Sequence, residues 1–185
     1  MKDFLFISAL EEEIGSDSVL GRNVLFSGIG KINACLAVFK AKELGYRKII
    51  NIGSCGSMNH EVGKVLKIGK VFQDIDCSPL SEYGTTYLEN VSEILFSESS
   101  YSCFSTDYFY DHNQQEKYSK DYLSKISECS VFDMECYALV KTCKSLDIKF
   151  ESYKWVSDDG NSENWKDNCK IGLENFKKYF LSNES

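Results

Sequence analysis

A strand–helix–strand pattern near the N-terminus places the strongest constraint on how this chain can fold. Residues 23–26 form a short apolar run of β-formers that ends at a Gly-Ile-Gly turn, residues 28–30. Apolar residues from Ile32 to Phe39 then recur at i, i+3, i+4 and i+7, and Gly45 stands where a glycine often ends a helix. Residues 48–52 form the next apolar run. Two strands joined by an amphipathic helix predict a right-handed parallel crossover.

The pattern returns in the second half of the chain. Residues 130–132 lead into a predicted helix with one apolar face, residues 150–156 form a predicted strand, and the last helix has Cys169, Leu173, Phe176 and Phe180 at helical spacing. The run 4–7 predicts a further strand near the N-terminus. Residues 53–57 predict a glycine-rich turn. The middle of the chain, residues 65–113, predicts strands with loops.

Composition and charge limit the kinds of partner. The 185 residues are 43% hydrophobic, and no linker or repeat divides them, so residues 1–185 are expected to form a single domain. A net charge of −7 would repel phosphate backbones, so we expect no nucleic-acid partner. No signal peptide and no apolar run of membrane length are seen, so we expect no membrane partner and a cytoplasmic location.

Eight cysteines and two histidines do not form a metal-ligand pattern. No C-x-x-C pair occurs, and His60 and His112 lie far from any paired thiols. We therefore expect no metal site. The cysteines are interpreted as reduced, small core residues of a cytosolic protein.

Three acidic motifs follow predicted strands, where open α/β sheets usually build their sites. They are residues 11–13, three consecutive glutamates; Glu135, at the junction of a strand and a helix; and residues 157–161, which include two aspartates. Each motif alone is also typical of a helix start or a polar turn.

Two glycine-bearing segments, residues 27–31 and 53–56, also follow strands. Their backbone amides could cradle an anion or approach a sugar. Neither has the spacing of a Walker A motif, and Asn33 stands where a dinucleotide fingerprint has its third glycine.

The order of these motifs resembles the purine nucleosidase and phosphorylase superfamily, and in particular the methylthioadenosine/S-adenosylhomocysteine nucleosidases. The matching segments are Ser8-Ala9-Leu10-Glu11-Glu12-Glu13, Ser27-Gly28-Ile29-Gly30-Lys31, Asn51-Ile52-Gly53-Ser54-Cys55-Gly56, Asp133-Met134-Glu135 and Val156-Ser157-Asp158. The fold predicted with this resemblance is a three-layer α/β/α domain with a central mixed sheet, nucleoside phosphorylase-like. The resemblance also implies a homodimer, and no metal or organic cofactor.

The resemblance assigns roles to the acidic residues. Asp158 would act as general acid toward the purine N7, which requires a raised pKa, and Ser157 would orient it. Glu13 would hold and activate the attacking water. Glu135 would accept hydrogen bonds from the ribose hydroxyls, with Met134 packed against the sugar.

The resemblance also predicts residues that contact the base and the sugar. In the segment 105–110, Phe109 would stack on the purine and the backbone of Tyr110 would bond its edge, although these aromatics could equally be core residues. Lys154 stands where similar nucleosidases tend to carry an arginine near the water. Ile29, Ser54 and Gly56 complete the predicted substrate-binding set.

The arginine content favours water over phosphate as the nucleophile. The resemblance implies that a phosphorylase of this superfamily would bind phosphate with arginines, one of them just before the Gly-Ser-Cys-Gly segment. Asn51 stands at that position here. Arg22 and Arg47 are the chain's only arginines, and Arg47 lies at the start of its strand.

We expect a hydrolase of a 5′-modified adenosine such as methylthioadenosine or S-adenosylhomocysteine. A phosphate-dependent purine nucleoside phosphorylase and a non-catalytic nucleoside-binding protein are the alternatives. The stretch 76–101 is shorter than in similar proteins, which bears on the base pocket and the subunit contact.

Overall fold

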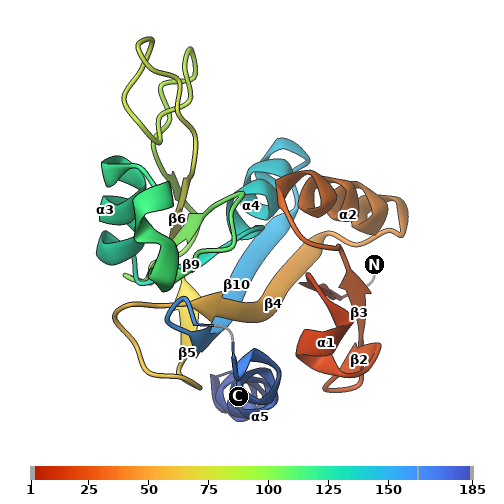
Figure 1. Cartoon of the computed structure of the whole chain (residues 1–185). Helices are drawn as coiled ribbons and strands as arrows, with labels where there is room; N and C mark the ends of the chain where they lie inside the picture. Colours follow the sequence, from red (N-terminus) through yellow and green to blue (C-terminus); the bar gives the residue numbers. More distant parts are fainter. Residues whose placement is uncertain (1–2, 162, 184–185) are drawn as a thin grey trace.

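The computed structural model describes residues 3–161 and 163–183, and it shows a mixed sheet with helices on both faces (Figure 1). The strands lie in the order β2-β3-β1-β4-β9-β8-β6-β7, while β10 lies beside β4 and β5 beside β10. The strands are β1 Leu5–Ser8, β2 Ser18–Val19, β3 Arg22–Phe26, β4 Lys48–Gly56, β5 Val65–Ile68, β6 Lys70–Gln73, β7 Ile94–Leu95, β8 Ser102–Ser105, β9 Val131–Asp133 and β10 Lys149–Asp158. The helices are α1 Glu11–Ile14, α2 Lys31–Glu43, the 3₁₀ helix η1 His112–Lys117, α3 Lys120–Glu128, α4 Cys136–Ser145 and α5 Trp165–Asn183.

The predicted crossover is present at the centre of the sheet. Strands β3 and β4 both lie parallel to β1, which runs between them, and α2 connects the two. Strand β10 lies parallel to β4, whereas β5 is antiparallel to β10 and β9 is antiparallel to β4. The prediction of an α/β fold around a central mixed sheet is therefore confirmed.

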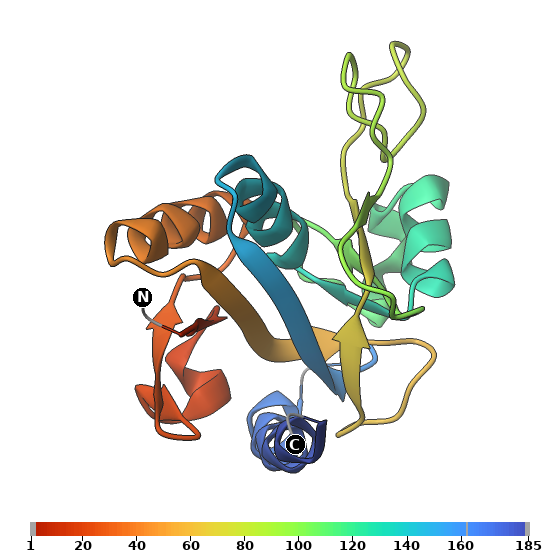
Figure 2. The ribbon, with the colours of Figure 1, turned by 180° about the vertical axis from the view of Figure 1, so that it is seen from behind.

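The helices cover the sheet in two layers. Helices α2 and α4 lie on one face, and α1 and α5 lie on the other (Figures 1 and 2). Neighbouring residues of one strand enter opposite layers, because strand side chains alternate: Ile7 joins the core under α2 and α4, and Phe6 packs with Phe176 of α5. A third apolar cluster around Phe104 and Phe132 lies against α3.

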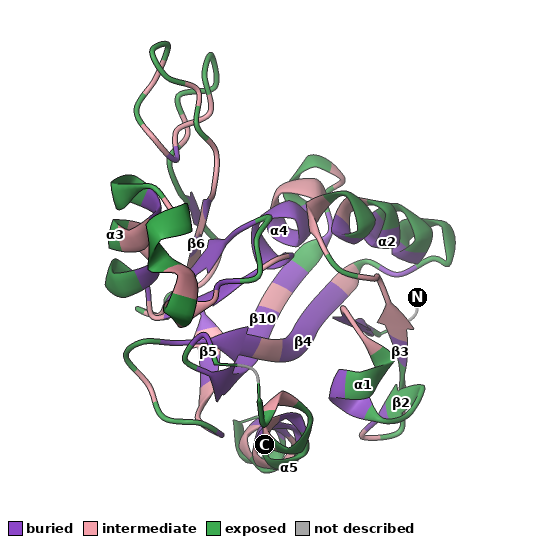
Figure 3. Ribbon diagram, in the orientation of Figure 1, coloured by how far each residue is buried: buried purple, intermediate pink, exposed green. Residues whose placement is uncertain are grey.

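Helix α2 buries a different face from the one its largest apolar residues suggest. Ile32, Leu36 and Phe39, which we call the α2 stripe, are 79%, 62% and 50% exposed. The buried residues of α2 are small or β-branched, namely Ala34, Ala37, Val38 and Ala41. Figure 3 shows the outer face of α2 as mostly exposed. The helix is present as predicted, and small side chains let it lie close to the sheet.

One glycine-rich segment folds differently from the prediction, and a second glycine divides a predicted strand region into two strands. The predicted turn at 53–57 is wrong for its first four residues, because β4 continues to Gly56 by pairing with β10 along its whole length. The apolar run 65–72 divides into β5 and β6 at Gly69, whose backbone N–H donates to the carbonyl of Tyr101. Pairing with a neighbouring strand decided both outcomes.

Between the middle region, residues 65–113, and β9 lies a helix that the sequence pattern did not indicate. Helix α3 begins after Ser119, whose hydroxyl caps it by accepting from the N–H of Tyr122. The segment between β6 and β8 forms an arm that projects from the body in both views (Figures 1 and 2). Within the described ranges, no helix is both long enough and apolar enough to cross a membrane.

Candidate active site

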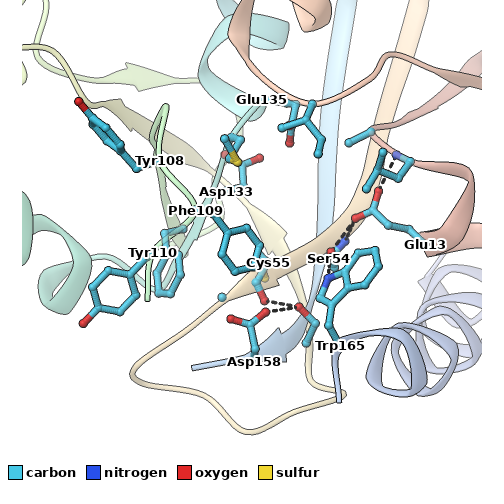
Figure 4. A pocket seen from close by; sticks show the side chains of 17 residues that line it. Glu13, Ser54, Cys55, Tyr108, Phe109, Tyr110, Asp133, Glu135, Asp158 and Trp165 are labelled. Atoms are coloured by element: carbon cyan, nitrogen blue, oxygen red, sulfur yellow. Dashed lines mark hydrogen bonds between the residues drawn. The ribbon is translucent and has the colours of Figure 1, made fainter. Parts of the chain in front are cut away.

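A pocket lies where β4, β9 and β10 end, beside the beginnings of α1 and α5 (Figure 4). Its enclosed part has a volume of about 100 Å³. The lining residues are Ala9, Leu10, Glu13, Ile29, Ser54, Cys55, Gly56, Tyr108, Phe109, Tyr110, Phe132, Asp133, Met134, Glu135, Ser157, Asp158 and Trp165. All the predicted site residues except Lys154 are among them. Segments far apart in the sequence therefore meet at one edge of the sheet, where ligands of open α/β sheets usually bind.

Glu13 is held by four hydrogen bonds although it belongs to a helix of a single turn. Its Oε1 accepts from the backbone N–H of Ser54 at 2.8 Å and from the Ser54 hydroxyl at 2.6 Å. Its Oε2 accepts from the hydroxyl of Ser8 at 2.8 Å and from the N–H of Leu10 at 3.1 Å. The residue is only 5% exposed. These donors fix the carboxylate in one orientation at the pocket wall.

Asp158 has the environment expected of a carboxylic acid that holds a proton. Burial raises its pKa above the ordinary value, against the opposing hydrogen bonds from the Ser157 hydroxyl and the Gly160 N–H. The Ser157 Oγ lies 2.7 Å from Asp158 Oδ2 and 3.1 Å from the carbonyl oxygen of Cys55. One hydroxyl proton cannot serve both acceptors, and a proton on Oδ2 would satisfy them in series. The arrangement is therefore compatible with a protonated Asp158.

Glu135 lies at the start of α4 and reaches across to the glycine-bearing turn before α2. Its Oε1 accepts from the backbone N–H of Gly30 at 2.9 Å. Gly30 has φ of +95°, a conformation that glycine adopts easily and that aims this N–H at the carboxylate. Burial, followed by the negative charge of Asp133, raises the pKa of Glu135 to about 7, against the opposing charge of Lys154. Met134 lies beside Glu135 in the pocket lining.

Three consecutive aromatic residues close one side of the pocket. Tyr108 and Phe109 are 61% and 58% exposed, whereas Tyr110 is buried and its ring packs edge-on against Phe132. Figure 4 shows the Phe109 ring among the other lining side chains and Tyr108 directed away from them. An exposed ring beside an acidic pocket provides a face on which a flat heterocycle can stack.

Lys154 does not line the pocket, because it is buried behind the wall that Asp133 forms. Its ammonium lies 2.7 Å from Asp133 Oδ2, and the two side chains are 3% and 1% exposed. Burial opposes both charges, yet their mutual attraction lowers the pKa of Asp133 and, together with Glu135, raises that of Lys154. Lys154 therefore contacts Asp133, two residues before Glu135, and does not line the pocket.

The pocket lining is acidic and contains neither lysine nor arginine. Glu13, Asp133, Glu135 and Asp158 are each less than 10% exposed. The arginines lie elsewhere, since Arg22 pairs with Asp3 and Arg47 donates to the carbonyl of Tyr46, before β4 begins.

Asn51, which stands where similar phosphorylases carry an arginine, is used inside the sheet. Its Nδ2 donates to the carbonyl of Ile7, and its Oδ1 accepts from the Ser152 hydroxyl. Its side chain therefore lies within the framework of the sheet and does not line the pocket.

Among the described residues, one group of side chains has the spacing of metal ligands: Cys103, Asp133 and Cys136. Asp133 in this group already accepts from Lys154, from Ser105 and from the N–H of Cys136. A metal ion would have to share this space with the Lys154 ammonium. The residues present do not suit a cation.

The sequence analysis missed several residues of the site, and three of them form hydrogen bonds or ion pairs there. Ser8 and Asp133 lie inside the motifs that carried the resemblance, and their position next to Glu13 and Glu135 was the available signal. Trp165 follows the acidic turn after β10, and its indole N–H donates to Ser54 Oγ at 3.1 Å. It precedes the apolar positions that predicted the last helix, and nothing in its sequence surroundings indicated a site.

The fold and the pocket together define an α/β protein with a buried acidic pocket at the ends of its strands. The chain belongs to the phosphorylase superfamily, whose family model matches residues 19–182. Glu13 precedes the matched residues. No curated protein sequence is significantly similar to the chain.

Solved structures share the fold over nearly the whole chain. A 5′-methylthioadenosine/S-adenosylhomocysteine nucleosidase of Helicobacter pylori has 18% identity and a TM-score of 0.78, with 97% of this chain and 96% of that chain covered. The futalosine hydrolase of the same organism has 18% identity, a TM-score of 0.77 and coverage of 97% and 95%. A putative nucleosidase of Francisella philomiragia has 17% identity, a TM-score of 0.80 and 98% coverage of both chains. The predicted family and nucleoside phosphorylase-like fold are thus confirmed.

Proposed function

We propose that this protein hydrolyses the N-glycosidic bond of a purine nucleoside, with 5′-methylthioadenosine or S-adenosylhomocysteine as substrate. The observation that carries the proposal is the charge of the pocket: four buried acids line it, and no lysine or arginine does. Buried carboxylates repel a phosphate dianion, and no arginine or lysine lines the pocket to pair with one. Water, in contrast, can be bound and activated by carboxylates.

Bond cleavage leaves negative charge on the base, and Asp158 is the residue proposed to neutralise it. Its raised pKa keeps the proton available for the purine N7, and Ser157 holds the carboxyl in place. Phe109 stacks on the base and the backbone of Tyr110 bonds its edge. The exposed ring of Phe109 at the pocket supports this assignment.

The sugar and the water are proposed to lie between Glu13 and Glu135. Glu13 takes the proton of the attacking water, and its four hydrogen bonds support a fixed anionic acceptor. Glu135 accepts from the ribose hydroxyls, with Met134 against the ring. Ile29, Ser54 and Gly56 shape the remaining wall. Lys154 contributes indirectly, through Asp133.

The size of the pocket supports a substrate that extends outwards. Its volume of about 100 Å³ is below the roughly 300–1,000 Å³ of most ligand sites. Leu10, Phe109 and Trp165 also border an outer hollow of about 420 Å³ whose lining includes Lys166 and Asp167. A 5′ substituent would occupy this hollow. Two of the similar structures, from Helicobacter pylori and Francisella philomiragia, carry the name 5′-methylthioadenosine/S-adenosylhomocysteine nucleosidase, which agrees with an extended group.

We also propose that residues 1–185 act as one domain, in the cytoplasm, and that two copies form a homodimer through the α2 stripe. Three large apolar side chains on one exposed helix face favour a partner. The stripe begins close to Ile29, which lines the pocket, so a second copy seated there would also shield the site. No other macromolecule and no cofactor is needed.

Release of free base, measured by chromatography, tests the proposed function. The pure protein is incubated with methylthioadenosine, S-adenosylhomocysteine, adenosine and inosine, each with and without phosphate. We expect adenine from the first two substrates at equal rates in both conditions. Strict dependence on phosphate would instead establish a phosphorylase. Absence of release, together with a thermal shift on nucleoside addition, would establish a non-catalytic binder.

A further inference from the structure

Trp165 is in contact with the residue proposed to activate water, through a single intervening hydroxyl. Its Nε1 lies 3.1 Å from Ser54 Oγ, which lies 2.6 Å from Glu13 Oε1. Figure 4 shows the three side chains in line at the pocket wall. Trp165 also lines both the pocket and the outer hollow, so its ring occupies the boundary between them.

The chemistry of the indole fixes the direction of the protons in this chain. An indole N–H donates and cannot accept, so Ser54 Oγ must be the acceptor of that bond. The hydroxyl proton of Ser54 is then left for Glu13, and a carboxylate can only accept when ionised. The Ser54 hydroxyl thus has one arrangement that satisfies both neighbours. Without the indole, the hydroxyl could rotate away from Glu13.

The packing of α5 holds Trp165 where this bond can form. Trp165 is the first residue of α5, and Gly172, two turns later, lies against the ring of Trp155 in β10. A Cβ at Gly172 would stand 2.1 Å from that ring, so only glycine permits this approach. Cys169 and Phe176 are fully buried on the same helix. The helix is therefore seated firmly against the sheet, and its first residue is not free to drift.

We propose that Trp165 is a positioning residue for Glu13: its indole N–H orients the Ser54 hydroxyl, and this hydroxyl holds the carboxylate aimed at the attacking water. The inference rests on the proposed hydrolysis for its catalytic consequence, although the hydrogen-bonded chain itself does not depend on it. Trp165 makes no proton transfer. It contributes by restricting the Ser54 hydroxyl and the Glu13 carboxylate to one orientation each.

The first test detects the hydrogen bonds from Trp165 through Ser54 to Glu13 by NMR, in the absence of substrate. The protein has two tryptophans, so ¹H–¹⁵N spectra contain two indole signals, and Trp165→Phe assigns the signal of Trp165 by its disappearance. In Ser54→Ala and in Glu13→Gln, we expect the Trp165 indole proton to move, while the Trp155 signal stays in place as the internal control. An unchanged Trp165 signal in Ser54→Ala would overturn the proposal.

The second test measures the catalytic effect by a double-mutant cycle. Trp165→Phe keeps an aromatic wall and removes the N–H. We expect kcat to fall about 3- to 10-fold, the equivalent of one ordinary hydrogen bond, with KM within about twofold. In a Ser54→Ala background the same change should have no further effect on kcat. An equal loss in both backgrounds would make Trp165 a wall residue only. If the wild-type protein releases no base, the proposed function fails by itself, and the indole signals still decide whether the chain exists.

Discussion

The ammonium of Lys154 lies 2.7 Å from the carboxylate of Asp133, and both groups are almost fully buried behind the pocket. Asp133 also accepts from the Ser105 hydroxyl and from the N–H of Cys136. The pair therefore joins β10 to β8, β9 and the start of α4, two residues from Glu135. A charge in such a place is tolerated only because its partner is present.

Lys154→Met is expected to lower the free energy of unfolding by about 3–5 kcal/mol, because it leaves the Asp133 carboxylate buried without its counter-charge. Urea unfolding followed by circular dichroism measures the change. Adding Asp133→Leu should recover most of the loss, because the double variant no longer contains either charge of this pair. Lys170→Met, which breaks an exposed ion pair, is the matched control and should leave the midpoint unchanged. Equal effects of the two lysine substitutions would contradict the role of burial.

The same pair predicts how stability depends on pH at the acid end. Burial alone would raise the pKa of Asp133, but the Lys154 charge and the hydrogen bonds lower it. A lowered pKa means that the stabilisation is complete above the unfolded value, about 3.9, and is lost as pH falls through the folded value. Unfolding midpoints measured below pH 4 should therefore drop more steeply for the wild type than for the Lys154→Met, Asp133→Leu double variant. Parallel curves would exclude this pair as a source of acid lability.

Glu135 is expected to cost stability when it is ionised. Its pKa is raised from 4.5 to about 7, so its contribution to stability is complete below the unfolded pKa and is lost as pH rises through the folded pKa. Since one pKa unit corresponds to about 1.4 kcal/mol, Glu135→Gln should raise the free energy of unfolding at pH 8.5 by about 1–3 kcal/mol, with little change at pH 4. Denaturation at the two pH values measures this. A destabilised variant at pH 8.5 would show that the carboxylate is supported by its surroundings.

Much of the framework could be predicted from the sequence because its signals are local. Short apolar runs ended by glycine or acidic residues identified β1, β3, β4 and β10, and apolar spacing identified α2, α4 and α5. Polar motifs directly after such runs predict a site without any knowledge of strand order, because parallel strands end at the same edge. The positions of Glu13 and Asp158 in one pocket follow from this rule, because β1 and β10 are both parallel to β4. Glu135 follows β9, which is antiparallel to β4, so its place in the pocket depends on the observed strand order.

The features that could not be predicted depend on long-range contacts. Gly53 to Gly56 read locally as a turn, and pairing with β10 makes them strand. Lys154 has the charge of a substrate ligand, but strand alternation points it toward Asp133. The exposure of Leu36 depends on which side of α2 meets the sheet, and both sides are apolar. The bond of Trp165 to Ser54 joins residues 111 positions apart.

The α2 stripe predicts a dimer that a single charge should disrupt. Leu36→Glu places a carboxylate in the middle of the stripe, where a partner's apolar side chains would have to bury it. Sedimentation velocity should give a mass near twice 21.1 kDa for the wild type and near 21.1 kDa for the variant. Ile171→Glu, at a residue of α5 that is 52% exposed and lies outside the stripe, is the control and should remain dimeric. A monomeric wild-type protein would contradict the proposed dimer through the α2 stripe.

Asp158→Asn is expected to abolish base release while the fold is retained. The amide has the size of the carboxyl but no acidic proton for the purine N7, and general acid catalysis typically contributes about 10²–10⁴-fold in rate. Asp159→Asn changes the adjacent residue in the same turn, whose side chain is 66% exposed, and should keep wild-type turnover. Chromatography of free adenine gives both rates, and thermal unfolding confirms that each variant is folded.

Since burial raises the pKa of Asp158, wild-type turnover should also decline as pH rises through that pKa and the proton is lost. Normal turnover by Asp158→Asn would remove Asp158 from the proton-transfer step, and the protonated acid would then have to be sought at Glu135, whose pKa is also raised.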